Sequence, residues 1–392
     1  MSILKKFTGD FRRLLLATLF FGATAGVISS TLNNYLNDVH GFGAGQRGWL
    51  ELPREMPGFF IIFVVGALLT YMRESRMAAV AMLFTGAGML GLGFLTPSTA
   101  LLVMWVVIWS MGDHIIFAVE GPLGLKLARK GGEGRRLGQL GGARNLGVIL
   151  GVSAVWLLAK LMGDRYDLFY VFGGLCAAIA GFFYFRLQLG HQDPPSRRLI
   201  YRREYHLFYA ISALFGIRKQ IFLVFGSWVL VDLHNVPVAT IALLYFIASL
   251  LGVVLRPLLG DVIDWLGERK VLVTDEVMLL VVCLIYAFVD NIMVLYGAYI
   301  LDHILFALRV ARTTYLKKIA VEQSDITPTI SLGITIDHTV AMTLPILSGF
   351  LWENYGHQWV FILAGAIALV GMVVCMQIKV PEPTPEPEGQ AT

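Results

Sequence analysis

The fold of this chain is decided by a phrase that occurs twice. The two copies are Asp113-His114-Ile115-Ile116-Phe117-Ala118-Val119-Glu120 and Asp302-His303-Ile304-Leu305-Phe306-Ala307-Leu308-Arg309. Each copy lies in the middle of a long apolar run, and the two lie far apart in the chain. A duplicated apolar segment predicts a protein built from two related halves. Charged side chains in such a segment are costly in lipid, so we expect them to serve a function.

The composition is that of a helical membrane protein. Of the 392 residues, 57% are hydrophobic and only 15% are charged, whereas roughly a quarter of the residues of a soluble protein are charged. The 41 glycines and 25 phenylalanines also suit membrane helices. The three cysteines, Cys176, Cys283 and Cys375, lie far apart in apolar runs, so we expect them to serve packing rather than disulfide or metal chemistry.

The apolar runs predict the helices of the fold. A helix needs about 20 apolar residues to cross a bilayer. We predict twelve such helices, over residues 11–37, 48–71, 76–95, 99–128, 136–160, 166–188, 206–233, 237–260, 270–289, 292–316, 327–352 and 358–379. Six helices then form an N-terminal bundle (1–189) and six a C-terminal bundle (206–380), with a cytoplasmic linker between them (190–205). A Pro- and Glu-rich tail (381–392) is predicted to be disordered. Two related six-helix halves are the layout of a transporter whose site lies between the halves.

Positive charges indicate the orientation, because cytoplasmic loops are enriched in Lys and Arg. If the N-terminus is cytoplasmic, the cytoplasmic segments collect Lys5, Lys6, Arg12, Arg13, Arg73, Arg76, Lys126, Arg129, Lys130, Arg135, Arg136, Arg197, Arg198, Arg202, Arg203, Arg269, Lys270, Lys317 and Lys318. The opposite side has little beyond Arg47, Lys160 and Arg165. We therefore expect a multi-pass protein of the cytoplasmic (inner) membrane with both termini in the cytoplasm.

The seventh helix has two interpretations. The segment between Lys219 and Asp232 is too short to cross a bilayer core of about 30 Å. Extending the helix back to Leu207 gives a sufficient length and places Arg218 and Lys219 near mid-membrane. The alternative is an interfacial helix over 201–216, with both cations at the lipid headgroups. We favour the buried arrangement, because the alternative leaves a very short spanning segment.

The loop between the eighth and ninth helices carries a recognisable motif. Its sequence, Gly260-Asp261-Val262-Ile263-Asp264-Trp265-Leu266-Gly267-Glu268-Arg269-Lys270, resembles the signature Gly-x-x-x-Asp-(Arg/Lys)-x-Gly-(Arg/Lys)-(Arg/Lys) of the major facilitator superfamily. Gly260, Asp264, Gly267 and Arg269 match, whereas Trp265 and Glu268 replace basic residues. We expect Gly260 to allow a close helix approach, Gly267 a tight turn, and Asp264 to lie at the start of the next helix.

The resemblance covers essentially the whole chain and implies the architecture in more detail. It implies an all-α membrane protein with two pseudo-symmetric six-helix bundles around a central cavity, which helices 1, 4, 7 and 10 line. It also implies a conformational-switch role for the signature loop. Drug/proton antiporters of this family usually carry Gly-Pro on the fifth helix, but here Gly147-x-x-x-Gly151 is followed by Val152.

The acids within the predicted helices are candidates for proton coupling. A carboxylate shielded from water can exchange protons in the physiological range, and a neighbouring imidazole can relay them. The candidates are Asp113, Asp302, His114, His303, Glu120 and Asp337. Asp113 and Asp302 come first, because both halves place them at the same depth.

The cations within the predicted helices are candidates for binding the substrate. They are Arg218, Lys219, Arg309 and Arg144, and Asn33 on the first helix is a further candidate contact. The planar fork of an Arg can hold a carboxylate by two hydrogen bonds. Four cations and four acids (Asp113, Glu120, Asp302 and Asp337) also allow an alternative in which these groups form structural ion pairs that lock helices together.

These patterns predict a secondary active transporter. Because no nucleotide-binding Gly-x-x-x-x-Gly-Lys-(Ser/Thr) loop occurs, we expect an ion gradient, most simply of protons, to supply the energy. The expected substrate is a small anionic or zwitterionic organic solute. The expected partners are therefore this solute, protons and the lipid bilayer. We expect no cofactor and no nucleic acid, and we expect the chain to be a monomer.

Three alternatives remain at the level of sequence. One is proton-coupled efflux of amphipathic drug-like compounds. Another is transport of a divalent transition metal by the Asp-His pairs at 113–114, 302–303 and 337–338. Adjacent residues on a helix diverge by about 100°, so one pair seldom supplies two ligands to one ion, and we predict no metal site. The third is a membrane enzyme or a non-transporting receptor, which is disfavoured because the Asp-His pairs lack an obvious Ser or Cys partner in the sequence.

Overall fold

The computed structural model describes residues 9–129, 132–189 and 201–379. Its α-helices are α1 (Gly9–Asp38), α2 (Ala44–Leu69), α3 (Glu74–Phe94), α4 (Thr99–Lys126), α5 (Glu133–Met162), α6 (Tyr166–Phe185), α7 (His206–Ile221), α8 (Val238–Leu266), α9 (Glu268–Phe288), α10 (Ile292–Leu305), α11 (Val310–Ile319), α12 (Ile326–Tyr355) and α13 (His357–Met376). The N-terminal basic residues up to 8, the linker residues 190–200 and the tail 381–392 lie outside the described residues.

The apolar runs form helices because a chain in lipid must satisfy its backbone hydrogen bonds within each segment. Eleven segments in the described part of the chain are long and apolar enough to cross a membrane. Two of them combine several elements, over Arg203–Leu233 and Ile292–Ile319. The remaining long helix is α2, which has Arg47, Glu51, Arg54 and Glu55 in its first half. With α2 included, the segments match the twelve predicted helices.

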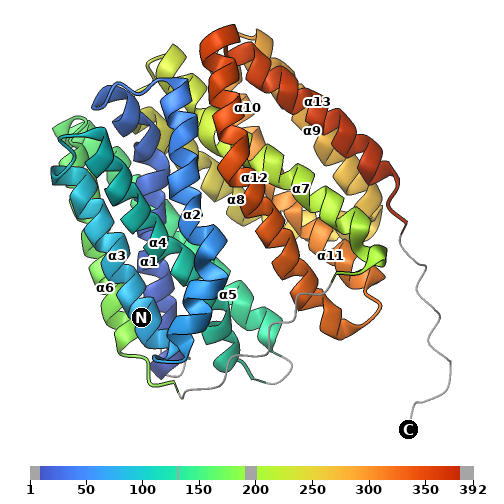
Figure 1. Ribbon diagram of the computed structural model, residues 1–392, viewed down its shortest axis with the longest axis horizontal. Helices are drawn as coiled ribbons and strands as arrows, with labels where there is room; N and C mark the ends of the chain where they lie inside the picture. The colour runs from blue at the N-terminus through green and yellow to red at the C-terminus, as the bar shows by residue number, and fades with distance from the viewer. Residues whose placement is uncertain (1–8, 130–131, 190–200, 380–392) are drawn as a thin grey trace.

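The helices form two bundles, which Figure 1 shows in blue to green and in yellow to red. In the first half, α1 packs against α5 and α6, and α3 packs against α4 and α6. In the second half, α9 packs against α13, and α7 packs against α12 and α13. The halves meet mainly where α2 lies along α12 and where α5 lies along α8. Side chains on α2, α5, α8 and α12 are therefore placed at this interface, and α4 and α7 lie next to it because they pack on α2 and α12.

The outer surface exposes many large apolar side chains. Large side chains such as Leu83, Phe94, Leu161, Phe182 and Phe288 are more than half exposed. An exposed apolar surface of this extent is characteristic of a protein that lipid surrounds. The buried polar and charged side chains instead face the interior or the interface between the bundles, where they can be paired.

The seventh membrane segment is one continuous element, as the buried interpretation predicts. Helix α7 continues past residue 216 to Ile221 and then into two π-helical turns, Phe222–Gly226 and Val229–Leu233. The interfacial helix over 201–216 is therefore not formed. π-Helical turns occur frequently at functional sites, and here they follow directly after Arg218, Lys219 and Gln220.

The tenth membrane segment is not the continuous helix that the sequence predicts. Helix α10 ends at Leu305, a 3-10 turn covers Phe306–Arg309, and α11 begins at Val310. The turn falls at the end of the second copy of the repeated phrase, whereas the first copy lies wholly within α4. Hydropathy alone does not distinguish these local geometries, because both keep the apolar side chains in the membrane.

Candidate functional site

Four charged residues of α2 form a network at the interface between the bundles. Positions 47, 51, 54 and 55 follow the spacing i, i+4, i+7 and i+8, which places them on one face of the helix. Arg47 Nη1 lies 2.6 Å from Glu51 Oε1, and Arg54 Nε donates to both oxygens of Glu51 at 2.9 Å. Arg54 also forms an ion pair with Glu55. All four side chains are almost completely buried.

The α2 network extends to both bundles. Gln220 on α7 donates from Nε2 to Glu51 Oε2 at 2.6 Å. Arg47 Nε donates to Asn33 Oδ1 on α1, also at 2.6 Å. The amide of Asn33 in turn donates to Ser227 Oγ at 2.7 Å. Asn33, a candidate substrate contact, thus lies between α2 and the π-helical part of the seventh segment.

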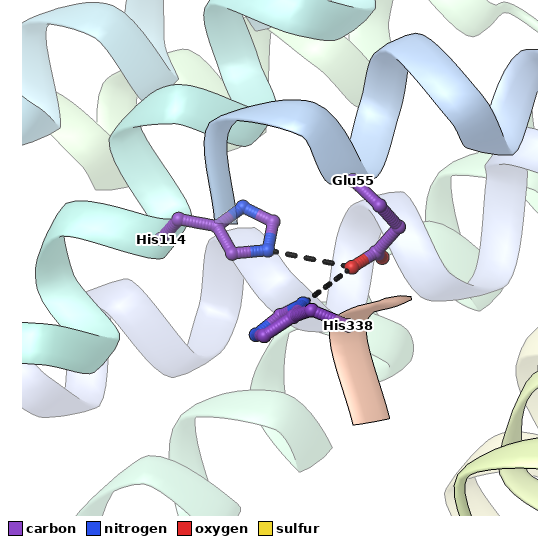
Figure 2. A group of neighbouring side chains, drawn as sticks. All are labelled: Glu55, His114 and His338. Carbon is purple, nitrogen blue, oxygen red and sulfur yellow. Dashed lines mark hydrogen bonds and ion pairs between the residues drawn. The ribbon is translucent and has the colours of Figure 1, made fainter. Parts of the chain in front are cut away.

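Glu55 brings two histidines together across the interface. Its Oε2 lies 2.9 Å from His338 Nδ1 on α12 and 3.6 Å from His114 Nε2 on α4. Figure 2 shows the carboxylate directed at both imidazoles. The other ring nitrogen of His114, Nδ1, lies 2.8 Å from the backbone oxygen of Ser110. His114, a proton-coupling candidate, therefore lies beside His338 of the opposite half, with the two ring centres 5.3 Å apart.

Asp113 lies on the neighbouring face of α4 and is buried within the first bundle. Its Oδ1 accepts a hydrogen bond from Thr85 Oγ1 on α3 at 3.2 Å. No cation of the described residues lies within ion-pair distance of this carboxylate. A buried carboxylate with a hydroxyl as its partner is costly to keep charged. This environment suits a group that gains and loses a proton.

Glu120, in contrast, has a complete set of donors. Thr18 Oγ1 donates at 2.6 Å and Tyr184 OH at 3.2 Å, and Arg144 forms an ion pair with the other oxygen. The guanidinium of Arg144 also lies 5.2 Å from the ring centres of Phe21 and Phe117. Arg144 and Glu120 thus join α1, α4, α5 and α6 of the first bundle, in the manner of a structural pair.

Arg218 is the centre of a charged cluster in the second bundle. Its Nη1 lies 2.6 Å from Asp275 Oδ2 on α9, and its Nη2 lies 3.6 Å from Asp302 Oδ1 on α10. The side chains of Arg218 and Asp275 are only 3% and 4% exposed. Nη2 of Arg218 makes no hydrogen bond to the described residues. One end of this guanidinium is therefore held, and the other has an unused donor.

The remaining candidates occupy separate positions around this cluster. Lys219 Nζ lies 2.6 Å from Asp337 Oδ2 on α12. The guanidinium of Arg309 lies 5.0 Å from the ring centre of Phe306. His303 Nδ1 lies 2.9 Å from the backbone oxygen of Tyr299, which is the counterpart of the His114–Ser110 contact. The repeat is thus preserved in this detail of local structure.

The signature loop matches its expected geometry only in part. Gly267 has φ +79°, so it forms the tight turn between α8 and α9 that we predict. A Cβ at Gly260 would meet nothing within 4 Å, so no close helix approach occurs there. Asp264 lies in the last turn of α8 rather than at the start of α9, and it is exposed, as is Arg269. Glu268, which replaces a basic residue of the motif, is buried and pairs with Lys318 at 2.7 Å.

Several residues of these clusters were missed by the sequence interpretation. They are Glu51, Arg54 and Glu55 on α2, Gln220 on α7 and Asp275 on α9. The spacing of the α2 charges was a usable signal, because four charges on one helical face are exceptional in a membrane span. Asp275 and Glu276 were also visible as two acids within the predicted ninth helix. Their pairing with Arg218 depends on tertiary contacts.

Comparisons with known proteins agree with this architecture. The family model of the Major Facilitator Superfamily matches residues 14–320. No curated protein matches the chain significantly. Among solved structures, the nucleoside transporter NupG has a TM-score of 0.75 at 14% identity, covering 95% of this chain and 99% of that one.

Two further structures are similar over nearly their whole length. A bacterial homologue of the human lysosomal transporter Spinster, in an inward-facing and unoccupied conformation, has a TM-score of 0.74 at 11% identity, covering 94% of this chain and 95% of that one. A D-xylose–proton symporter has a TM-score of 0.71 at 14% identity, covering 95% and 97%. At these identities the similarity shows the fold alone. With the family match over most of the sequence, the chain belongs to the Major Facilitator Superfamily.

Proposed function

We propose that this transporter moves a small organic solute with an anionic group, alone or as part of a zwitterion, together with protons. Membership of the superfamily makes the chain a transporter rather than an enzyme. In this proposal the two bundles rock around a site between them, with both termini cytoplasmic. The observation that carries the proposal is the unused donor of Arg218 beside Asp302.

Arg218 is the residue we assign to binding the solute. Asp275 holds its Nη1, so the guanidinium is already oriented and partly neutralised. The contact of Nη2 with Asp302 is 3.6 Å long, which is longer than a good hydrogen bond. A solute carboxylate can replace Asp302 at this end and gain a charge-assisted hydrogen bond. π-Helical turns, which are frequent at functional sites, begin directly after residue 221 and so lie next to this group.

Protonation of Asp302 provides the coupling in this scheme. A neutral Asp302 no longer competes with an anionic solute for Arg218, so proton binding and solute binding favour each other. Asp113 is the second proton site in the proposal, since its described partner is the hydroxyl of Thr85. The repeat places these two acids at equivalent positions of the two halves.

Uptake by proteoliposomes tests the proposal. The solute panel contains acidic, zwitterionic and neutral metabolites, including a nucleoside and D-xylose, because structural neighbours are named as carriers of these compounds. We expect accumulation of an anionic or zwitterionic solute that dissipation of the proton gradient abolishes. Accumulation that ignores the proton gradient, or that is restricted to neutral or cationic solutes, would contradict the proposal.

Three variants separate the roles of the residues. Arg218→Lys keeps the charge beside Asp275 but loses the planar fork, so we expect about a tenfold weaker solute affinity. Asp113→Asn with Asp302→Asn should abolish the response to the proton gradient. Arg13→Gln, which removes a surface ion pair with Asp10, is the control and should transport normally. Normal coupling in the double Asp variant would show that other residues carry the proton.

A further inference from the structure

Glu55, His114 and His338 converge from three helices at the interface between the bundles (Figure 2). Their nearest ligand atoms all lie within 4.8 Å of one another. Glu55 and His114 belong to α2 and α4 of the first bundle, and His338 belongs to α12 of the second. The side chains of Glu55 and His114 are 8% and 7% exposed. This cluster is distinct from the cluster around Arg218.

The hydrogen bond of His114 to the backbone directs a lone pair into the cluster. Nδ1 lies 2.8 Å from the Ser110 carbonyl oxygen, which can only accept, so Nδ1 carries the hydrogen. In the neutral ring, Nε2 then presents its lone pair to Glu55 Oε2. The gap of 3.6 Å between these atoms is too long for a direct hydrogen bond. Two acceptors in this position repel each other unless a proton or a metal cation lies between them.

Gly58 makes the room for the two imidazoles. It lies about one helical turn after Glu55 on α2. A Cβ at this position would lie 2.4 Å from His114 Cδ2 and Nε2, and 2.9 Å from His338 Cε1. Any side chain larger than hydrogen would therefore push the rings apart. The close arrangement of the three ligand groups depends on this glycine.

The surrounding charges leave the cluster able to accept a cation. Arg54 engages the other oxygen of Glu55 and leaves Oε2 directed at the imidazoles. The charged neighbours are the cations Arg47 and Arg54 and the carboxylates Glu51, Glu55 and Asp113. Glu51 and Glu55 offset the two guanidinium groups, and Asp113 adds a negative charge whenever it is deprotonated. The positive charge of a divalent ion in this position is therefore partly compensated by these carboxylates.

We propose that Glu55, His114 and His338 form a binding site for a divalent first-row transition ion, for which Zn²⁺ is the best match. Two imidazole nitrogens and one carboxylate oxygen, with a fourth position open, are a known zinc ligand set. Two ligands of a tetrahedral zinc ion lie about 3.4 Å apart when each bond is about 2.1 Å. The Glu55–His114 gap of 3.6 Å fits this value. Without metal, His338 Nδ1 donates its hydrogen to Glu55 Oε2 at 2.9 Å, so His338 binds the ion as its other tautomer, with the hydrogen on Nε2. The gap between these two atoms then opens by about 0.5 Å.

Such an ion locks the two bundles in the arrangement observed here. It joins α2 and α4 to α12, and a ligand that favours one conformation shifts the population toward it. We therefore expect Zn²⁺ to stabilise the protein and to slow transport. The effect on transport rests on the alternating-access mechanism of the proposed function, whereas the binding itself does not.

Zn²⁺ binding to the full chain in detergent, after removal of metals with a chelator, tests this site. We expect one tightly bound Zn²⁺ per chain by equilibrium dialysis and a Zn²⁺-dependent rise of Tm, with no comparable effect of Mg²⁺ or Ca²⁺. His114→Ala, His338→Ala and Glu55→Gln should each weaken binding at least tenfold. Gly58→Ala keeps all three ligands but should weaken binding by a similar factor, because the added methyl group displaces the rings.

The repeat provides the matched control. His303→Ala removes the counterpart of His114, whose Nδ1 contacts Tyr299 and which lies outside the cluster; Zn²⁺ affinity should be unchanged. If His338→Ala has a much lower Tm than the wild type without metal, His338→Asn replaces it in the test, because Asn keeps a polar contact to Glu55. Absence of Zn²⁺ binding, or equal affinity in the His338 and His303 variants, would overturn the proposal. If the proposed proton coupling is wrong, this test is unaffected, because it measures Zn²⁺ binding and not transport.

Discussion

At the scale of single residues, pairing distinguishes the buried charges from one another. Glu120 receives hydrogen bonds from Thr18 and Tyr184 and an ion pair from Arg144. Asp113, only seven residues earlier on the same helix, has the hydroxyl of Thr85 as its described partner. Removing one partner of a buried pair leaves an uncompensated charge, which costs more than the pair itself contributes. The two acids should therefore respond differently to substitution.

Arg144→Leu should lower the free energy of unfolding by about 2 kcal/mol, because Glu120 stays buried without its cation. This value lies below the roughly 3–5 kcal/mol found for fully buried pairs, because the Arg144 side chain is 32% exposed and solvent screens part of the interaction. Adding Glu120→Gln to this variant should recover part of the loss. Reversible unfolding of the wild type, the two single variants and the double variant in detergent micelles measures these free energies. Arg165→Gln breaks an exposed pair with Asp167 and serves as the control; an equal loss in both single variants would refute the assignment.

At the scale of elements, close backbone contact determines how α1 packs on α5. A Cβ at Gly147 on α5 would lie 1.9 Å from the backbone oxygen of Leu19 on α1. The partner position on α1 is also a glycine, Gly22, where a Cβ would lie 2.1 Å from the backbone oxygen of Arg144. Small residues let membrane helices approach closely, and dispersion then holds them together. This contact also fixes Arg144 relative to Thr18 and Glu120.

Gly147→Ala should therefore destabilise the first bundle by about 3 kcal/mol, because the methyl group must displace a backbone carbonyl. Gly141→Ala is the control on the same helix, since a Cβ there meets nothing within 4 Å. We expect this control to be neutral or slightly stabilising, because Ala favours helix more than Gly does. The Tm values of both variants, measured by thermal unfolding in the same detergent, are compared. Similar Tm values would mean that α1 and α5 can separate without cost.

At the scale of the whole molecule, polar contacts join the two halves at the end that carries residues 38–44. Asn34 Nδ2 donates to Val236 O at 2.8 Å, and Asn37 Nδ2 donates to Asp232 Oδ1 at 3.1 Å. The backbone amide of Gly45 donates to Glu353 Oε1 at 2.9 Å. These contacts hold α1 against the seventh segment and α2 against α12, and Figure 1 shows α2 beside α12. They must break if this end opens during transport.

Asn37→Ala combined with Glu353→Ala should shift the population toward a conformation open at this end. A cysteine at position 227 reports the change, because Ser227 is buried beside Asn33 in the closed arrangement. The native cysteines are buried and give a low background. We expect labelling by a membrane-impermeant thiol reagent to rise several-fold. Asn354→Ala, which loses only a contact within α12, should leave labelling unchanged, and an equal rise there would refute the role of these contacts.

The predicted segments and the observed elements differ where local geometry departs from a plain helix. The apolar runs locate the membrane segments to within a few residues, because the length of a span follows from the thickness of the bilayer. They do not reveal the π-helical turns after Ile221 or the 3-10 turn at Phe306–Arg309. These geometries preserve the hydropathy of the segment, so composition carries no signal for them.

The candidate site, like the fold, could be predicted from the sequence only in part. Asp113, Asp302, Arg218 and Arg144 stand out in the sequence because a charge in an apolar run is costly, whatever the fold. Their partners could not be assigned, because a partner is set by which helices touch. Asp275 lies 57 positions after Arg218 in the chain and only 2.6 Å from it in space. Of the α2 charges, only Arg47 was considered, as a residue on the side opposite the cytoplasm, although the spacing of all four places them on one buried face.

The sequence by itself therefore determined the membrane class, the twelve segments, the duplication and the residues that are expensive to bury. These properties depend on the bilayer and on local periodicity, which act on each segment separately. Only the tertiary structure decided that Glu120 is fully paired, that Arg218 keeps an unused donor, and that His114 of the repeated phrase meets Glu55 and His338 across the interface. Such contacts arise from packing between helices that are distant in the chain, so no single segment of sequence specifies them.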